Sequence, residues 1–141
     1  MTSTPSLAAK HYTMLAQDSG IDDDVITERG YRTCTGYSEL KSLGIILGRN
    51  TDANGLLLPL WGVDGIPATH LLVKEDRHVP YTVFRPDIPM ISHDGRERKY
   101  LNPKSARIRL DSHPRCHDAL QDLTRFLWVT EGIKNNGPAK S

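Results

Sequence analysis

The fold is decided by the stretch GLLLPLWGVDG at residues 55–65. The three leucines at 56–58 predict a short buried strand. Pro59 has no backbone N–H to give to a neighbouring strand, which favours a place near the edge of a sheet or at a bulge. Val63-Asp64-Gly65 is typical of a turn, and residues 68–73 then predict the returning strand of a hairpin. Outward from this hairpin we expect a small, mostly antiparallel sheet.

Further strands are predicted after the hairpin. Residues 81–84 predict a third strand, and the sequence around 93–95 predicts a polar turn. Residues 106–110 alternate between cationic and apolar side chains, which would place two arginines on one face of a strand. The apolar run 125–130 predicts a last strand, and we expect Trp128 to be buried there in the core of the sheet.

Short helices are predicted before the sheet. The apolar spacing over residues 7–15 predicts the first helix, which ends at Ser19-Gly20. The acidic triplet 22–24 suits the start of a second, because carboxylates there meet exposed N–H groups and the positive end of the helix dipole. Gly30 would end that helix, and a third spans 38–43. A metal site on the acidic triplet is the alternative, although successive helix residues point in different directions.

The length of the chain fits a single domain. Its 141 residues and 15.8 kDa are enough to bury a core of its own. We predict the α+β class for one domain at 1–134, with a helical part at 1–50 and a sheet part at 55–134, followed by a polar tail at 135–141. The order of the elements is short helices first and then the sheet, which ends in a C-terminal strand.

The composition predicts a cytoplasmic protein without a membrane partner. No apolar stretch approaches the roughly 20 residues that a membrane-spanning helix needs, and the first ten residues lack the pattern of a secretory signal. Cys34 and Cys116 are therefore interpreted as free thiols in a reducing compartment.

The net charge of +1 hides an uneven distribution. Residues 1–67 carry five basic and eight acidic side chains, whereas residues 68–116 carry ten basic and six acidic ones. A local excess of positive charge can attract an anionic partner even when the total is near zero. Phe84 and Tyr100 lie among these cations, and an unstacked base can rest on an aromatic ring. The plain alternative is an ordinary solvated face. The candidate contacts with nucleic acid are Arg85, Arg96, Arg98, Lys99, Lys104, Arg107 and Arg109.

Other chemistries have weaker support. The segment HPRCH at 113–117 holds three possible metal ligands, two histidines and a cysteine, whereas a structural zinc site usually has four ligands. A turn with a small buried thiol is the simpler interpretation of that segment. The tail at 132–141 resembles a P-loop only in composition, because Gly-Lys-Ser/Thr is interrupted and no helix follows. No nucleophile motif is present, so these motifs predict no metal site and no catalytic residue.

A series of short motifs resembles the polymerase core of bacterial DNA primase. The series runs GLLLPLWGVDG at 55–65, FRPD at 84–87, RKYLNP at 98–103 and LWVTEGIK at 127–134. In that core, an N-terminal subdomain with these features leads into the first strand of a TOPRIM fold, which ends in Glu-Gly. The chain is more closely similar to a TOPRIM-associated domain family of unknown function, found in primase–helicase proteins of phages and plasmids, which also shows a segment like RLDSHP at 109–114.

The resemblance implies a nucleic-acid-binding domain in the DNA replication of a mobile element. Its ligand would be single-stranded DNA or a primer–template, and its protein partner a helicase or the missing TOPRIM half. The family places a metal-binding carboxylate at Glu131, but the Asp-x-Asp pair that would follow and complete a magnesium site is absent after it. Glu131 is thus expected to be vestigial, with no catalysis by this chain alone, and magnesium bound only if another chain completes the fold. The alternative is a stand-alone protein-interaction module, or a phage-encoded regulator or inhibitor derived from a primase.

Overall fold

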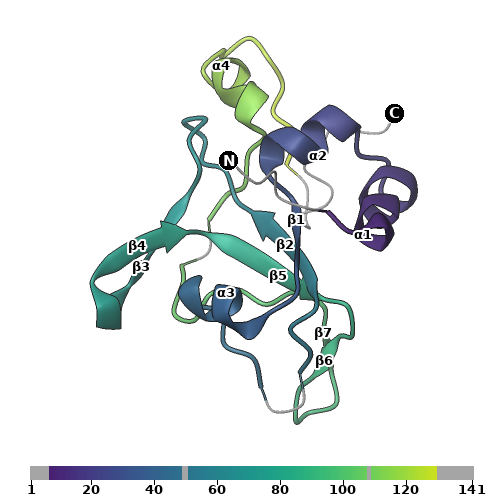
Figure 1. The fold of residues 1–141 in the computed structure, drawn as a ribbon. Coiled ribbons are helices and arrows are strands. Elements are labelled where there is room, and N and C mark those ends of the chain that lie inside the picture. Colours follow the sequence, from purple (N-terminus) through teal and green to yellow (C-terminus); the bar gives the residue numbers. More distant parts are fainter. Residues whose placement is uncertain (1–6, 49–50, 108, 130–141) are drawn as a thin grey trace, which may run out of the picture.

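The computed structural model describes residues 7–48, 51–107 and 109–129. A three-stranded antiparallel sheet lies at its centre, in the order β1 (Arg32–Cys34), β2 (Gly55–Pro59) and β5 (Thr82–Pro86) (Figure 1). Short helices and small antiparallel sheets make up the rest, so the predicted α+β class is confirmed.

The strand β2 lies in the middle of this sheet, not at the edge or bulge that its proline favoured. It pairs with β1 on one side and β5 on the other. Pro59 is tolerated because it is the last residue of the strand. The ladder continues one residue later, where the backbone N–H of Leu60 donates to the carbonyl of Tyr81 at 2.9 Å.

The leucine run of β2 supplies two hydrophobic cores. Successive strand residues point to opposite faces of a sheet, so Leu56 and Leu58 pack in one cluster with Ile26, whereas Leu57 packs in another with Leu40. All three leucines are fully buried. A strand covered on both faces reads as a continuous apolar run and not as an alternating one, which explains the sequence of this stretch.

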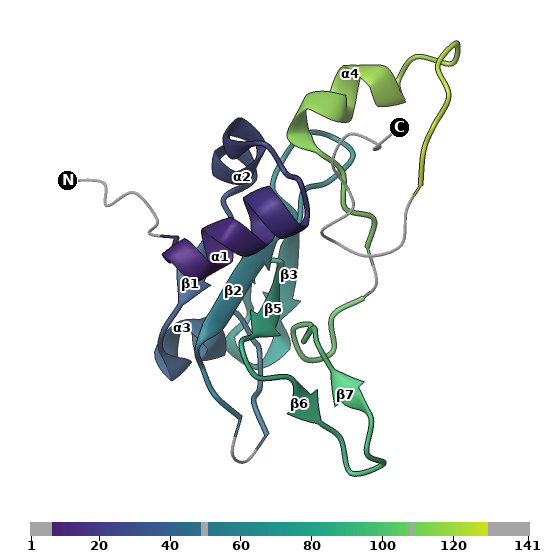
Figure 2. The same cartoon turned by 90° about the vertical axis from the view of Figure 1, so that its right-hand side faces the viewer.

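Helices flank the sheet, and the three N-terminal ones lie close to their predicted positions. The predicted order of helices first and then the sheet is wrong in one respect, because β1 lies between the second and the third of these helices. Asp22 precedes the second helix and two more aspartates occupy its first turn. Gly20, Gly30 and Gly44 follow the three N-terminal helical segments with φ of 66°, 76° and 78°, a backbone conformation that glycine adopts without strain. Figure 2 shows the first two helical segments beside each other, apart from α3. The bounds are α1 (Ala9–Thr13), continuing as the π-helical η1 (Met14–Asp18), then α2 (Asp23–Arg29), α3 (Tyr37–Ser42), the 3-10 turn η3 (Pro114–Cys116) and α4 (His117–Leu120).

Two hairpins extend from the central sheet (Figure 1). The predicted turn at 63–65 forms, but the chain that returns from it pairs with the residues just after β2 over a short length only. The N–H of Ala68 donates to the carbonyl of Leu60 at 3.0 Å, after which the chain pairs with a new neighbour. The predicted turn around 93–95 joins the second hairpin. The first consists of β3 (Thr69–Leu72), the 3-10 turn η2 (Val73–Glu75) and β4 (Arg77–Pro80), and the second of β6 (Met90–Ile91) and β7 (Glu97–Arg98).

A buried histidine ties the first helix to the sheet. The ring of His11 is 1% exposed, with Nδ1 2.7 Å from Oγ1 of Thr33 on β1 and Nε2 2.7 Å from Oδ1 of Asp87, just past β5. Both ring nitrogens are thus satisfied, as a buried polar group requires. The Asp87 carboxylate also pairs with Lys10 at 2.5 Å.

Two predicted strands are wrong. The described residues of 106–110 form no strand, and neither do residues 125–129. Trp128, expected in the core, is 80% exposed. A strand persists only where a neighbour takes up its backbone hydrogen bonds, and no strand within the described ranges pairs with residues 125–129. In the part of the chain that the structure describes, no helix is long and apolar enough to cross a membrane.

Candidate nucleic-acid interface

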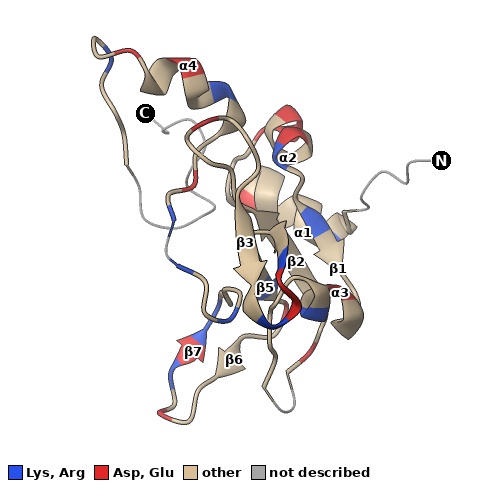
Figure 3. Cartoon of the chain, turned by 90° about the vertical axis from the view of Figure 1, so that its left-hand side faces the viewer, with Lys and Arg blue, Asp and Glu red and all other residues tan. Residues whose placement is uncertain are grey.

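Six cations predicted from the sequence lie exposed on a hairpin and the coil that follows it. Figure 3 shows the blue segments in β7 and along the coil that rises from it toward α4. The coil carries no helix over these residues, and two carboxylates, Asp94 and Glu97, accompany the cations on the hairpin. We call the following six residues the basic strip: Arg96, Arg98, Lys99, Lys104, Arg107 and Arg109.

Most side chains of the basic strip have no partner among the residues that the structure describes. Arg96 lies 3.8 Å from the Asp94 carboxylate, and Arg109 donates to the backbone carbonyl of Thr69 at 2.9 Å. No hydrogen bond or ion pair occupies the other four cations within the described ranges. These four are Arg98, Lys99, Lys104 and Arg107. They can meet an anion without first giving up another contact.

Arg85 is placed differently from the basic strip. It is half-buried on β5, where its guanidinium contacts the Met14 sulfur and lies 5.9 Å from the centre of the Tyr100 ring. A guanidinium over an aromatic face is attracted by the negative charge of the ring. The structure therefore turns Arg85 toward η1 and leaves it outside the strip.

The aromatic rings that the sequence interleaves with the cations are not free platforms for bases. Phe84 is fully buried in the core, and Tyr100 is half-buried beneath Arg85. The exposed ring in this region is that of Tyr37, which is 62% exposed at the start of α3. Sequence reasoning missed it. Helical spacing gives no signal for it, because Tyr37 lies three residues before Leu40, which is the spacing of side chains that share one helical face.

A buried ion pair fixes the far end of the coil that carries the strip. The carboxylate of Asp111 pairs with Arg29 of α2, and their side chains are 6% and 1% exposed. Asp111 also accepts from the backbone N–H of Trp61 at 2.9 Å, and the Trp61 indole N–H donates to the carbonyl of Arg29 at 3.1 Å. Three elements are thus joined where the strip ends. The sequence offered no spacing that would have paired two residues so far apart.

Titratable groups around this ion pair are held in their neutral forms. Burial raises the pKa of Tyr31, whose ring lies 5.5 Å from the Arg29 guanidinium, to about 12. Burial, and next the Arg29 charge, lower the pKa of His113. A low dielectric disfavours the charged forms of both groups. Tyr31 and His113 therefore add no charge beside the ion pair near pH 7.

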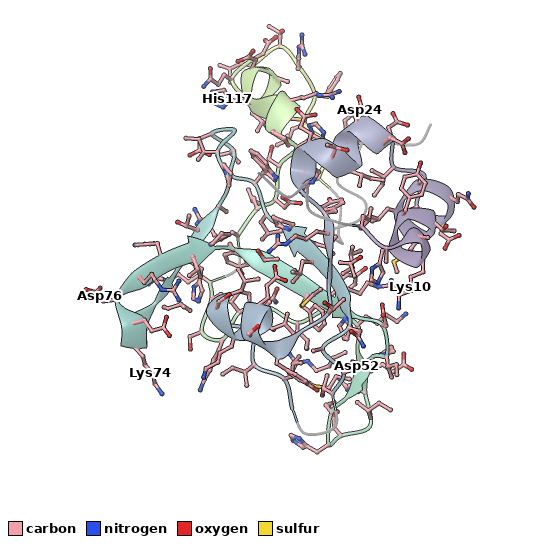
Figure 4. All side chains as sticks on the ribbon, in the orientation of Figure 1. Lys10, Asp24, Asp52, Lys74, Asp76 and His117 are labelled. Carbon is pink, nitrogen blue, oxygen red and sulfur yellow. The ribbon has the colours of Figure 1, made fainter. Side chains whose placement is uncertain are left out.

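The segments considered as metal sites hold other contacts. His113 Nδ1 accepts from the Arg115 N–H at 3.0 Å, and His117 Nδ1 lies 3.0 Å from the carbonyl of Val63. Arg115 also pairs with Asp24 of the acidic triplet at 3.0 Å. Figure 4 labels Asp24 on α2 and His117 on α4. Among the residues described, no group of three or more His, Cys, Asp or Glu side chains is arranged to hold a metal ion.

The two cysteines are free and lie in different settings. Cys34 is buried, and burial raises the pKa of its thiol. A raised pKa reduces the thiolate fraction that nucleophilic chemistry requires. The interpretation of Cys116 as a small buried thiol in a turn is wrong in part, because the turn forms but the side chain is exposed. Glu131, to which the resemblance assigns a vestigial metal-binding role, and the tail at 132–141 lie outside the described residues. No protein-family model, curated protein or solved structure matches the chain.

Proposed function

We propose that this chain binds single-stranded nucleic acid through the basic strip. The observation that carries the proposal is that four exposed cations along one hairpin and coil have no partner within the described residues. Neutralising phosphates with lysine and arginine releases condensed counterions, which is the dominant source of affinity in sequence-independent binding. The phosphate backbone of a nucleic acid can run along an extended row of cations, as it does in proteins that bind single strands.

The biological setting of the proposal rests on the resemblance to primase cores. It supports single-stranded DNA or a primer–template as the ligand, replication of a mobile element as the process, and the cytoplasm as its place. A helicase or a TOPRIM half on another chain would be the protein partner. We expect no catalysis by these 141 residues alone, because a magnesium site needs several oxygen ligands and the resemblance assigns only Glu131 to them.

The test is direct binding of a fluorescently labelled single-stranded oligonucleotide, followed by anisotropy. Arg107→Ala/Arg109→Ala should weaken binding on the order of tenfold at low salt and should do so equally for different sequences, because phosphate contacts carry no base information. The matched control is Lys74→Ala/Arg77→Ala, which removes two exposed cations from the β3–β4 hairpin, where Figure 4 labels Lys74. Wild-type affinity in a folded strip variant would overturn the proposal, as would equal losses in the strip and control variants.

A second candidate function, protein interaction, is favoured by the apolar residues after α4. Leu123 is 98% exposed and Phe126 94% exposed, and residues 127–129 are also apolar and exposed. Contiguous exposed apolar surface is typical of protein-binding sites. Binding of a protein partner that Phe126→Ser/Trp128→Ser abolishes, together with absence of any oligonucleotide binding by the wild type, would favour this function over the first.

A further inference from the structure

Two hollows adjoin each other beside the basic strip and share Ile46 in their walls. The first, of about 490 Å³, lies against α3 and the residues after it, and Tyr37 and Lys41 are in its lining. The second, of about 330 Å³, is lined by Arg98 of β7 and by Asn102 and Lys104 of the coil. Both volumes lie within the range of roughly 300–1,000 Å³ that small-ligand sites occupy.

The charge of the linings favours an anion. Among the described residues, the linings contain three cations, Lys41, Arg98 and Lys104, and no carboxylate. Arg98 and Lys104 are the two cations of the second hollow, and neither has a side-chain partner in the described part of the chain. An arginine fork and a lysine ammonium on one hollow match a phosphate group.

The first hollow has the opposite character, because hydrocarbon dominates its lining. Tyr37 is 62% exposed and Ile46 64% exposed, so an apolar, partly aromatic surface faces solvent there. The Tyr37 hydroxyl donates to the backbone carbonyl of Thr51 at 2.9 Å. This bond holds the ring in place, so less conformational entropy is lost when a flat ligand packs on it.

The two hollows are joined through the backbone. The backbone N–H of Lys104 donates to the carbonyl of Gly44 at 2.9 Å. The residue after Gly44 is Ile45, whose backbone N–H donates to the carbonyl of Leu40 on α3 at 2.9 Å. Gly44 itself has a φ of +78°, and a side-chain carbon there would come within 2.6 Å of Leu72. The spacing between the cationic and the apolar hollow is therefore fixed by the fold before any ligand arrives.

We infer that the paired hollows bind one nucleotide unit of the single strand, with its base on the Tyr37 ring and its phosphate between Arg98 and Lys104. This inference rests on the proposed function and gives it a specific subsite. A nucleotide consists of a flat base joined through its sugar to a phosphate, which can accept several hydrogen bonds. The apolar hollow suits the base, and the cationic hollow beside it suits the phosphate. Stacking on tyrosine tolerates any base, so the subsite adds affinity without sequence preference.

The experiment compares an oligothymidylate with an abasic oligonucleotide of the same length, which keeps the phosphates and lacks the bases. Tyr37→Ala should weaken oligothymidylate binding by about 5- to 150-fold and leave the abasic strand unaffected. Tyr37→Phe keeps the ring but loses the hydrogen bond to Thr51, so it should bind oligothymidylate less tightly than the wild type and more tightly than Tyr37→Ala. Arg98→Ala/Lys104→Ala should weaken binding of both strands, whereas Lys74→Ala/Arg77→Ala, which also removes one lysine and one arginine, should change neither.

The outcomes separate this inference from the proposed function. If the wild type binds no single strand, the proposed function fails and the subsite with it. If the wild type binds and Arg107→Ala/Arg109→Ala weakens it, but Tyr37→Ala does not, the subsite alone is overturned. Equal losses on both strands in Tyr37→Ala would also overturn base stacking. An acidic peptide that displaces the oligonucleotide through the same residues at equal affinity would replace the nucleotide by a protein ligand.

A second measurement needs no substitution near the hollow. Ultraviolet irradiation of the wild-type chain with an oligonucleotide containing 5-iododeoxyuridine should attach the base to Tyr37, as read by mass spectrometry of the digested protein. Crosslinks confined to other aromatic residues would contradict the inference.

Discussion

Removing the Asp111 carboxylate should destabilise the fold far more than removing an exposed carboxylate. Asp111 is 6% exposed and pairs with Arg29, which is 1% exposed. Arg29 Nε and Nη1 have no hydrogen-bond partner within the described residues, so the carboxylate is the principal compensation for a buried positive charge. Asp111→Ala would leave that charge uncompensated and would also remove the acceptor for the Trp61 N–H.

The magnitude follows from these two losses. Breaking a buried ion pair by removing one partner typically costs about 3–5 kcal/mol, a large share of the roughly 5–15 kcal/mol that stabilises a domain. Asp111→Asn keeps an oxygen that can accept from Trp61 while losing the charge, so it should be less damaging by about 1 kcal/mol. Replacing both charges, as in Arg29→Met/Asp111→Leu, should restore part of the loss because no buried charge remains.

The assay is urea unfolding followed by far-ultraviolet circular dichroism. Glu75→Ala is the control, because Glu75 pairs with Arg77 while both side chains are about half exposed, at 54% and 52%. Exposed pairs contribute less than about 1 kcal/mol. If Asp111→Ala and Glu75→Ala shift the unfolding midpoint by similar amounts, the buried pair does not hold the coil as we describe.

Three further predictions concern pH, the apolar segment and catalysis. Burial lowers the pKa of His113 below its ordinary value of 6.5, so the unfolded chain takes up that proton first, and stability should fall as pH drops through 6.5. His113→Gln should flatten the pH dependence of stability between pH 7 and 5, and an unchanged slope would contradict this. Trp128 is 80% exposed, so in a Trp61→Phe background acrylamide should quench its fluorescence readily, whereas protection would indicate a covered segment. Incubation with single-stranded DNA, nucleotides and magnesium or manganese should give no primer, and Glu131→Gln should leave binding nearly unchanged. Primer synthesis that this variant abolishes would show that a metal site forms in another way, for instance across a dimer.

Local signals predicted the helices and the turns well, because their causes lie within a few residues. The acidic triplet and Gly30 mark the ends of α2, and the turn before β3 forms where the Asp-Gly pair stands. The leucine run predicted a buried strand for the same reason. Its central position could not be predicted, because whether Pro59 interrupts the ladder depends on where the strand ends.

The features of the fold that the sequence did not predict depend on contacts between residues far apart in the chain. Residues 125–129 have the composition of a strand, yet a strand requires a neighbour, and composition does not reveal whether one is present. The pairing of Arg29 with Asp111 spans 82 positions in the sequence, and no periodic pattern indicates it. The candidate site was likewise predicted only in part. Charge counting found the cations of the basic strip, whereas the exposed Tyr37 ring and the hollows beside it emerge only from the folded arrangement.

The most direct test of the central claim is the salt dependence of binding to a single-stranded oligonucleotide. Each phosphate contact contributes about 0.7 to the slope of log affinity against log salt for single strands. Four cations without a partner among the described residues therefore predict a wild-type slope of about −3. Arg107→Ala/Arg109→Ala removes one of these four together with Arg109, which is bonded to Thr69, and should make the slope shallower by about 0.7. A wild-type slope near zero, or an identical slope in a folded double variant, would contradict phosphate binding by the basic strip.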